Sequence, residues 1–298
     1  MAITLERIKI QPIKIDKNKS FEVLILDVEP YKNSFSGKIL GRDLKYWVKF
    51  ACRDLPSRII EYDNASNVLE FVGSYINTKF DYTIVLFSKT PLLEVGDIES
   101  LKDFAIYKQI NLCKLPAGYI VSNKYLVENT TWSVDSVYAN ATDNFYIVEN
   151  KKQYKYALEV LQDRINNFHM DNGVEITKPS SVYIEPEVDI ERGVIIYPSV
   201  SLKGSTTIGM DTIIKDNAVI VDSVIGDKCF IGGANIEKTK IENMACIGSF
   251  CNIIESSIGA ETIIDAGCNI VKAKIKSKEK INANSNIGEI NDSSSGTR

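Results

Sequence analysis

Residues 182–209 read VYIEPEVDIERGVIIYPSVSLKGSTTIG, and this stretch decides the fold of the second half of the chain. Its large aliphatic residues return every six positions, beginning with Ile184, Ile190 and Ile196. Neither the 3.6-residue period of a helix nor the two-residue alternation of an ordinary strand produces this spacing. The series continues to Ile287 and has nineteen positions, eighteen of them Ile, separated by thirteen steps of six residues and five steps of five.

A small or β-branched residue stands two places before nearly every one of these positions, with Glu279 as the one clear exception. One large and one small inward residue in each hexad is the pattern of a parallel β-helix built from hexapeptides. Three hexads form one coil, so the series predicts about six coils of a left-handed β-helix. Cys229, Cys251 and Cys268 occupy small inward positions, for which we expect a structural role rather than a reactive one.

The first half of the chain alternates candidate strands with candidate helices. The strands are short apolar runs and the helices have apolar residues along one face, with strands expected at 22–28, 58–62 and 83–87 and helices near 44–51 and 98–105. This alternation predicts an α/β domain with an open, largely parallel sheet. The expected order is therefore an α/β domain at 1–150, a linker helix within 151–173, a β-helix at 174–290 and a disordered tail at 291–298.

Composition and charge exclude several classes of partner. The net charge is −4 and no block of basic residues occurs, which argues against nucleic acid. No apolar run approaches the roughly 20 residues of a membrane-spanning helix, and the first residues do not resemble an export signal. Six cysteines without a CxxC pair are expected to be reduced thiols in a cytoplasmic protein. A single histidine mostly excludes histidine-rich metal sites and histidine-based catalysis.

Several segments resemble one enzyme family. Residues 164–204 (RINNFHMDNGVEITKPSSVYIEPEVDIERGVIIYPSVSLKG), with 222–227 (DSVIGD) and 245–250 (ACIGSF), are similar to the bifunctional bacterial enzyme that makes UDP-N-acetylglucosamine. Residues 85–93 (VLFSKTPLL) resemble its strand ending in GDTPLL, and 116–119 (PAGY) resemble its later Gly-Tyr turn. That enzyme couples glucosamine-1-phosphate acetyltransferase to N-acetylglucosamine-1-phosphate uridyltransferase. The resemblance implies a nucleotidyltransferase-like, truncated Rossmann-type sheet, a left-handed β-helix, and a homotrimer formed through the β-helix.

Most residues that the family uses for nucleotide transfer are absent. Its Gly-rich phosphate loop is replaced by residues 27–40 (DVEPYKNSFSGKIL), where acidic groups would repel phosphate, although Lys38 matches a phosphate-contacting lysine of the family. Lys89 stands where the family has the carboxylate that holds Mg²⁺, and hard cations need oxygen ligands. The family's second metal ligand falls on Glu149 or Asn150, depending on a one-residue gap. The segment that recognises uracil and sugar is shortened to a single helix.

The acetyl-transfer residues of the family are also missing. Its histidine base lies in a stretch that matches residues 282–289 (NANSNIGE), with Ala283 at the histidine position. Alanine cannot accept a proton. A phosphate-binding arginine of the family falls near Ile254. The only histidine, His169, belongs to the junction between the two domains, where a contact at the helix end is expected rather than catalysis.

Three interpretations remain open. The chain is a divergent relative with both catalytic sites lost, acting as a sugar-nucleotide-binding or assembly protein; or a working sugar-1-phosphate nucleotidyltransferase with rearranged ligands; or a hexapeptide acyltransferase. We favour the first, because loss of one donor at a charged site already costs about 10²–10³ in rate. No catalytic residue is then expected, and a remnant cleft is expected at Lys38, Lys89, Thr90, Gly118 and Tyr119.

The favoured interpretation also specifies cofactors and partners. No metal site is expected, since Glu149 and Asn150 are the only candidate ligands. No cofactor is expected, and Mg²⁺ and acetyl-CoA would be needed only under the second and third interpretations. A sugar nucleotide is the expected small-molecule partner, and the chain itself is the expected protein partner, as a homotrimer.

Overall fold

The computed structural model describes residues 18–28, 37–63, 67–139 and 142–288. The predicted disordered tail at 291–298 lies outside the described residues. Contacts divide the chain into two compact units, the first formed by residues 1–37 and 42–154 and the second by residues 38–41 and 155–298. No helix among the described residues is both long enough and apolar enough to cross a bilayer.

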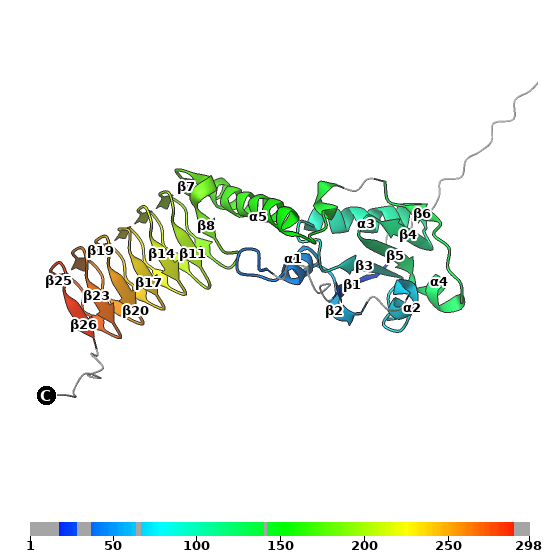
Figure 1. The fold of residues 1–298 in the computed structure, drawn as a ribbon, viewed down its shortest axis with the longest axis horizontal. Helices are drawn as coiled ribbons and strands as arrows, with labels where there is room; N and C mark the ends of the chain where they lie inside the picture. The colour runs from blue at the N-terminus through cyan, green and yellow to red at the C-terminus, as the bar shows by residue number, and fades with distance from the viewer. Residues whose placement is uncertain (1–17, 29–36, 64–66, 140–141, 289–298) are drawn as a thin grey trace, which may run out of the picture. The chain divides into compact units, whose positions relative to one another are not determined.

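The first unit contains a six-stranded sheet in the order β2-β1-β3-β5-β4-β6 (Figure 1). Its strands are β1 (Phe21–Val28), β2 (Ser57–Tyr62), β3 (Tyr82–Phe87), β4 (Leu112–Leu115), β5 (Gly118–Ser122) and β6 (Ser136–Val137). Strands β1, β2 and β3 are parallel, at the three positions that the sequence predicts. Strand β5 is antiparallel to both β3 and β4, so the sheet is mixed rather than largely parallel.

Four short and medium helices accompany this sheet, namely α1 (Leu44–Ala51), α2 (Val68–Gly73), α3 (Val95–Lys108) and α4 (Asn123–Glu128). The apolar faces read from the sequence are buried, as Trp47 and Val48 of α1 and Leu101 of α3 illustrate. Strand β1 is buried along almost its whole length, which is expected of a central strand covered on both faces. These buried side chains form two clusters, one on each face of the sheet.

The β4–β5 hairpin requires a glycine where it meets β3. Leu115 pairs with Gly118 across a two-residue turn, Pro116-Ala117. Gly118 has a φ of +144°, and a Cβ atom placed on it would lie 2.0 Å from the carbonyl oxygen of Val85. The sequence motif PAGY is therefore explained by the packing of β5 against β3.

The second unit is a left-handed β-helix of about seven turns, built from hexapeptides. Its strands stack into three faces, which Figure 1 shows in order from β7 and β8 to β25 and β26. Face 1 contains β7 (Glu175–Ile176), β10 (Ile195–Ile196), β13 (Ile213–Ile214), β16 (Phe230–Ile231), β19 (Cys246–Ile247), β22 (Ile263–Ile264) and β25 (Lys280–Ile281). Face 2 contains β8 (Tyr183–Ile184), β11 (Ser201–Lys203), β14 (Val219–Val221), β17 (Asn235–Glu237), β20 (Asn252–Ile254), β23 (Asn269–Val271) and β26 (Asn286–Gly288). Face 3 contains β9 (Asp189–Ile190), β12 (Thr207–Ile208), β15 (Val224–Ile225), β18 (Lys240–Ile241), β21 (Ser257–Ile258) and β24 (Lys274–Ile275).

All nineteen aliphatic positions of the sequence series pair with one another in three columns, one behind each face. Behind face 2, for example, Ile236, Ile253 and Ile270 are direct partners in successive coils. The columns are buried except in the last coil, where Ile281 and Ile287 are partly buried. One further position, Ile176 of β7, precedes the series and pairs with Ile196, which accounts for the additional turn.

Several small polar inward residues donate to backbone carbonyls of the next coil. Thr212 donates its hydroxyl to the Gly226 carbonyl at 2.8 Å, and Cys251 and Cys268 each donate a thiol to a carbonyl at 3.2 Å. These contacts satisfy polar groups that would otherwise be costly inside an apolar core. The structural role expected for the inward cysteines agrees with this arrangement.

One outward column of face 2 is a ladder of amides. Asn235, Asn252, Asn269 and Asn286 lie one above the other in successive coils. Each side-chain amide nitrogen donates to the amide oxygen of the next asparagine at 2.8–2.9 Å. The ladder therefore adds a continuous chain of side-chain hydrogen bonds parallel to the backbone ladder.

Helix α5 (Lys151–Asp171) corresponds to the predicted linker helix. From residue 155 onward it belongs to the second unit. Ile165 and Met170 pack against the β-helix core. Asn166 is fully buried and donates its amide to the carbonyls of Pro179 and Val182. The helix thereby covers apolar residues at the first coil.

We expect Gly118→Ala to destabilise the first unit by more than about 2 kcal/mol, because the methyl group would collide with a backbone carbonyl and the φ value is unfavourable. Gly96→Ala is the matched control, since nothing lies within 4 Å of a Cβ atom at Gly96. This control should change stability by no more than about 1 kcal/mol, in the stabilising direction. Denaturant unfolding followed by tryptophan fluorescence measures both, because Trp47 and Trp132 are the only tryptophans and both lie in the first unit. Equal effects of the two substitutions would contradict the argument.

Candidate functional site

Five of the sequence-predicted site residues lie around the carboxyl end of β3. Lys89 and Thr90 follow this strand, and Gly118 and Tyr119 begin β5, which pairs with it. Glu149 lies within ion-pair distance of Lys89. In open α/β sheets this end of the parallel strands is the usual place for a ligand. The structure thus brings these five predicted residues together near one edge of the sheet.

The centre of this region is an ion pair. The Lys89 Nζ lies 4.0 Å from Glu149 Oε1, and the backbone N–H of Val148 donates to the Lys89 carbonyl at 2.8 Å. The Lys89 side chain is only 13% exposed, whereas that of Glu149 is 60% exposed. An ammonium group therefore occupies the position beside Glu149 in which the resemblance would place a metal-binding carboxylate.

Asn150, the alternative to Glu149, has a different role. Its side-chain oxygen accepts from the backbone N–H groups of Lys152 and Gln153 at 3.0 Å, which caps the first turn of α5. Gln153 in turn accepts from the N–H groups of Glu149 and Asn150. Glu149 is therefore the residue that faces Lys89, and Asn150 holds the start of the helix.

The remaining predicted site residues of this unit serve the fold. Thr90 is fully buried and donates its hydroxyl to the Phe87 carbonyl at 2.9 Å. Tyr119 packs against the apolar cluster on one face of the sheet. Gly118 is required by its approach to β3. These three contacts are made within the protein, and none of them needs a ligand.

An acidic group that the sequence analysis only partly anticipated lies at the carboxyl end of β1. Asp27 Oδ2 accepts from Lys45 Nζ at 2.6 Å, and Asp27 is paired across the strands with Glu61 of β2. The hydrogen bond with Asp27, and then its negative charge, raise the pKa of Lys45, and the charges of Asp43 and Glu61 act in the same direction. Asp27 was predicted to oppose phosphate here. Lys45 and Glu61 were missed, because the packing of α1 brings Lys45 to this point and the pairing of β1 with β2 brings Glu61.

Lys38 belongs to the second unit, whereas the other predicted site residues belong to the first. It precedes Ile39 and Leu40, which are both fully buried, and Gly41, whose φ is +75°. A Cβ atom at Gly41 would lie 2.5 Å from the carboxylate of Glu185, so the turn rests directly on the β-helix. Residues 38–41 therefore pack against the β-helix and belong to the second unit.

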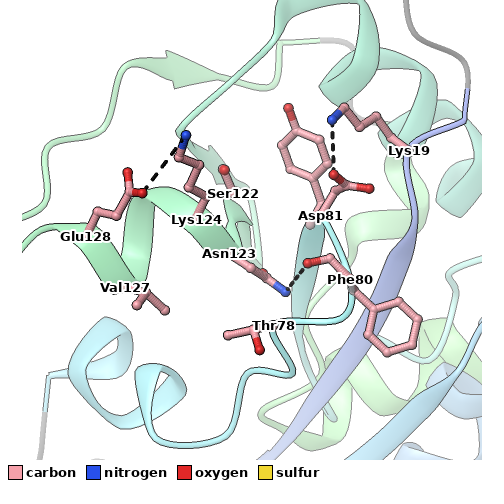
Figure 2. Close-up of a pocket in the computed structure, with 10 residues that line it drawn as sticks. Lys19, Thr78, Phe80, Asp81, Ser122, Asn123, Lys124, Val127 and Glu128 are labelled. Atoms are coloured by element: carbon pink, nitrogen blue, oxygen red, sulfur yellow. Dashed lines mark hydrogen bonds and ion pairs between the residues drawn. The ribbon is translucent and has the colours of Figure 1, made fainter.

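A separate cavity of about 360 Å³ lies at the other end of β3, near its first residue (Figure 2). Asp81 accepts there from Lys19 at 3.0 Å and from both polar groups of Ser20, and chiefly the Ser20 N–H lowers its pKa. Asn123 donates to the carbonyls of Asn77 and Phe80. These bonds join the segment that leads into β3 to the segment that leads into β1 and to the start of α4, and no sequence motif pointed to this cavity.

The structure does not support a Mg²⁺ site around Lys89. Mg²⁺ is bound by oxygen ligands, and here the Glu149 carboxylate faces an ammonium group instead. Among the described residues, no group of three or more His, Cys, Asp or Glu side chains could hold a metal. Ala283 is exposed in the turn after β25 and offers no proton acceptor, so the residues present do not fit the acetyl-transfer base of the resembled family either.

Comparison with known proteins agrees with the resemblance. The family described as GlmU-like, C-terminal hexapeptide matches residues 211–296. The bifunctional protein GlmU of Caldanaerobacter subterraneus is 33% identical over 165 residues, covering 55% of this chain and 35% of that protein. GlmU of Streptococcus thermophilus is 36% identical over 220 residues, covering 65% of this chain and 47% of that protein.

The chain is a relative of the GlmU proteins. It spans between 23% and 47% of the length of the curated GlmU sequences that it matches. Among solved structures, the acetyltransferase domain of PglB from Neisseria gonorrhoeae matches 90% of this chain and 96% of that chain, with 9% identity and a TM-score of 0.29. A likeness at that level says nothing about the site of this GlmU relative.

His169 lies on α5 and is 4% exposed. Burial lowers its pKa, and the charge of Asp189 opposes this only in part. The folded chain therefore favours the neutral imidazole. The burial of the side chain agrees with a packing role for His169.

We expect the free energy of unfolding to fall as the pH is lowered from 7 to 5. The pKa of His169 is lower in the folded state than in the unfolded state, where it is about 6.5, so its stabilising contribution is complete above that pH and declines below it. His169 is the only histidine, and ordinary carboxylates titrate at lower pH. Denaturant unfolding followed by circular dichroism should show this slope for the natural chain and a flatter one for His169→Gln. An unchanged slope in the variant would contradict the assignment.

Proposed function

We propose that this GlmU relative has kept the two-unit scaffold without the uridyltransferase and acetyltransferase chemistries, and acts as a sugar-nucleotide-binding or assembly protein. The observation that carries the proposal is the ion pair between Lys89 and Glu149. An ammonium group in this place neutralises the carboxylate and repels a divalent cation, and nucleotidyl transfer relies on such cations to neutralise the phosphates.

Two further features support the proposal. Asp27 lies near the end of β1, where the resemblance would place the phosphates, and it is paired across the strands with a second carboxylate, Glu61, while Lys45 donates to it. Thr90 uses its hydroxyl within the protein. A neutral or cationic part of a ligand suits this surface better than a triphosphate does.

A hexapeptide acyltransferase is the second candidate, because the family match falls on the β-helix. Acetyl-CoA would then bind to coils of the second unit. Ala283 argues against this candidate, because alanine cannot serve as the base at this position. The homotrimer and the cytoplasmic location expected from the sequence remain predictions, and sedimentation of the full chain tests the first of them.

We expect no pyrophosphate release when the chain is mixed with UTP, Mg²⁺ and N-acetylglucosamine-1-phosphate, with a GlmU enzyme as the positive control. UDP-N-acetylglucosamine should raise the melting temperature by mass action if the cleft still binds a sugar nucleotide. Pyrophosphate release at ordinary enzyme rates would overturn the proposal. Free thiol released from acetyl-CoA in a sugar-phosphate-dependent reaction would favour the acyltransferase. No melting shift with any sugar nucleotide would leave the assembly role alone.

Replacement of the ammonium group should create the missing metal site. Lys89→Asp would place two carboxylates together, and we expect Mg²⁺ or Mn²⁺ to bind to this variant with a dissociation constant of about millimolar order. Lys89→Met is the control, because it removes the charge without adding a ligand and should not bind. Titration calorimetry and the electron paramagnetic resonance signal of Mn²⁺ measure both. Equal binding by the natural chain and by Lys89→Asp would show that Lys89 does not block the site.

A further inference from the structure

The outward residues of face 1 form an unusually apolar surface. In each two-residue strand of this face the second residue enters the core, so the first residue points outward. Over five successive coils these first residues are Ile195, Ile213, Phe230, Cys246 and Ile263, which we call the apolar stripe. Phe230 is 41% exposed and Ile263 46% exposed. Strands in such a ladder are about 4.8 Å apart, so the stripe is straight and about 19 Å long.

The corresponding outward columns of the other two faces are mostly polar, with Tyr183 and Val219 as the larger exceptions on face 2 and Val224 on face 3. On face 2 the column includes the asparagine ladder, and on face 3 it consists of Asp189, Thr207, Val224, Lys240, Ser257 and Lys274. The unbroken run of five apolar residues in the column of first strand residues therefore distinguishes face 1 from the other two faces, where apolar residues such as Val219 and Val224 are interrupted by polar ones. A continuous exposed apolar patch on a rigid surface, bordered by polar residues, is typical of a protein interface.

The two ends of the stripe carry opposite charges. Glu175 precedes Ile195 in the same outward column, and Lys280 follows Ile263. Lys280 is 63% exposed and lies 3.7 Å from Asp265, an exposed pair of the kind that contributes little to stability. The whole column thus reads as one acidic residue, five apolar residues and one basic residue, along seven coils.

When the column is read in the opposite direction, each residue meets one of suitable chemistry: the acidic end meets the basic end, and the apolar residues meet apolar residues. If a second copy is turned end over end and laid against face 1, Phe230 in the fourth coil meets its own counterpart. Ile213 then meets Cys246, Ile195 meets Ile263, and Glu175 meets Lys280 at both ends. Because the two ladders have the same spacing, all seven levels match in register. With parallel axes, Glu175 would meet Glu175 and Lys280 would meet Lys280.

We propose that two copies of this chain associate face to face through the apolar stripe, with antiparallel β-helix axes and a two-fold axis at Phe230. Each copy uses the same surface, as a two-fold contact requires. Paired phenylalanines at the centre supply the kind of aromatic anchor that dominates binding energy at interfaces. The Glu175–Lys280 contacts at the two ends select the antiparallel orientation.

The proposed contact does not depend on the proposed loss of chemistry. It is also distinct from the homotrimer expected from the resemblance, because a three-fold assembly uses a different symmetry operation. Assemblies with dihedral symmetry contain both kinds of contact. The contact therefore predicts an even number of copies, either two or six.

Sedimentation of the full chain over a range of concentrations tests the contact. We expect Phe230→Asp to raise the dissociation constant of the even-numbered assembly by about a hundredfold, since two carboxylates would meet at the centre of the interface. Val224→Asp is the matched control. It is an outward residue with 46% exposure on face 3, and its substitution should leave assembly unchanged. Circular dichroism melting of both variants verifies that the β-helix remains folded.

Exchange of the end charges tests the orientation without disturbing the centre. Glu175→Lys alone should weaken association by about tenfold at low salt, because lysine would meet Lys280 at both ends. The double variant Glu175→Lys with Lys280→Glu should restore it. A chain that remains monomeric, an odd-numbered assembly, an assembly unaffected by Phe230→Asp, or a double variant no better than the single one would overturn the proposal.

Discussion

The stacking of one inward aliphatic side chain on the next determines most of this structure. Each inward isoleucine lies directly above its partner in the preceding coil, about one strand spacing away, and its burial contributes roughly 1.5–3 kcal/mol. Because three such columns fill the interior, the remaining inward positions accept only small side chains. The alternate residues must point outward. The apolar stripe and the asparagine ladder therefore owe their straightness to the interior columns.

The sequence predicted the β-helix well because its signal is local and repeated. Whether a residue points inward or outward depends only on its place in the hexad, so nineteen positions were assigned correctly without knowledge of the whole fold. The additional turn was missed for a physical reason. Ile176 lies eight residues before Ile184, and the short helical turn at Pro179–Ser181 interrupts the period between them. A search for a regular period cannot recognise an irregular first coil.

The first unit was harder to predict, because its decisive contacts are made between distant residues. The three parallel strands were expected, but β4 and β5 were not, and a two-residue connection such as Pro116-Ala117 joins only antiparallel strands. The candidate site depended even more on tertiary structure. Motif comparison identified Lys89 and left Glu149 and Asn150 as alternatives, while only the folded chain distinguishes the residue that faces Lys89 from the one that caps α5. Likewise, nothing in the residues around Lys38 indicates that the following turn rests on the β-helix.

The asparagine ladder has a consequence for how this half of the gene can change length. Successive coils differ by one or two residues, as the distances from Ile220 to Ile236 and from Ile236 to Ile253 show, and these differences are absorbed at the corners. Within a strand there is no such tolerance, since a one-residue insertion would turn the isoleucine outward and the asparagine inward. Tolerated insertions and deletions should therefore remove or duplicate complete coils, which shortens or lengthens the prism while leaving its cross-section unchanged.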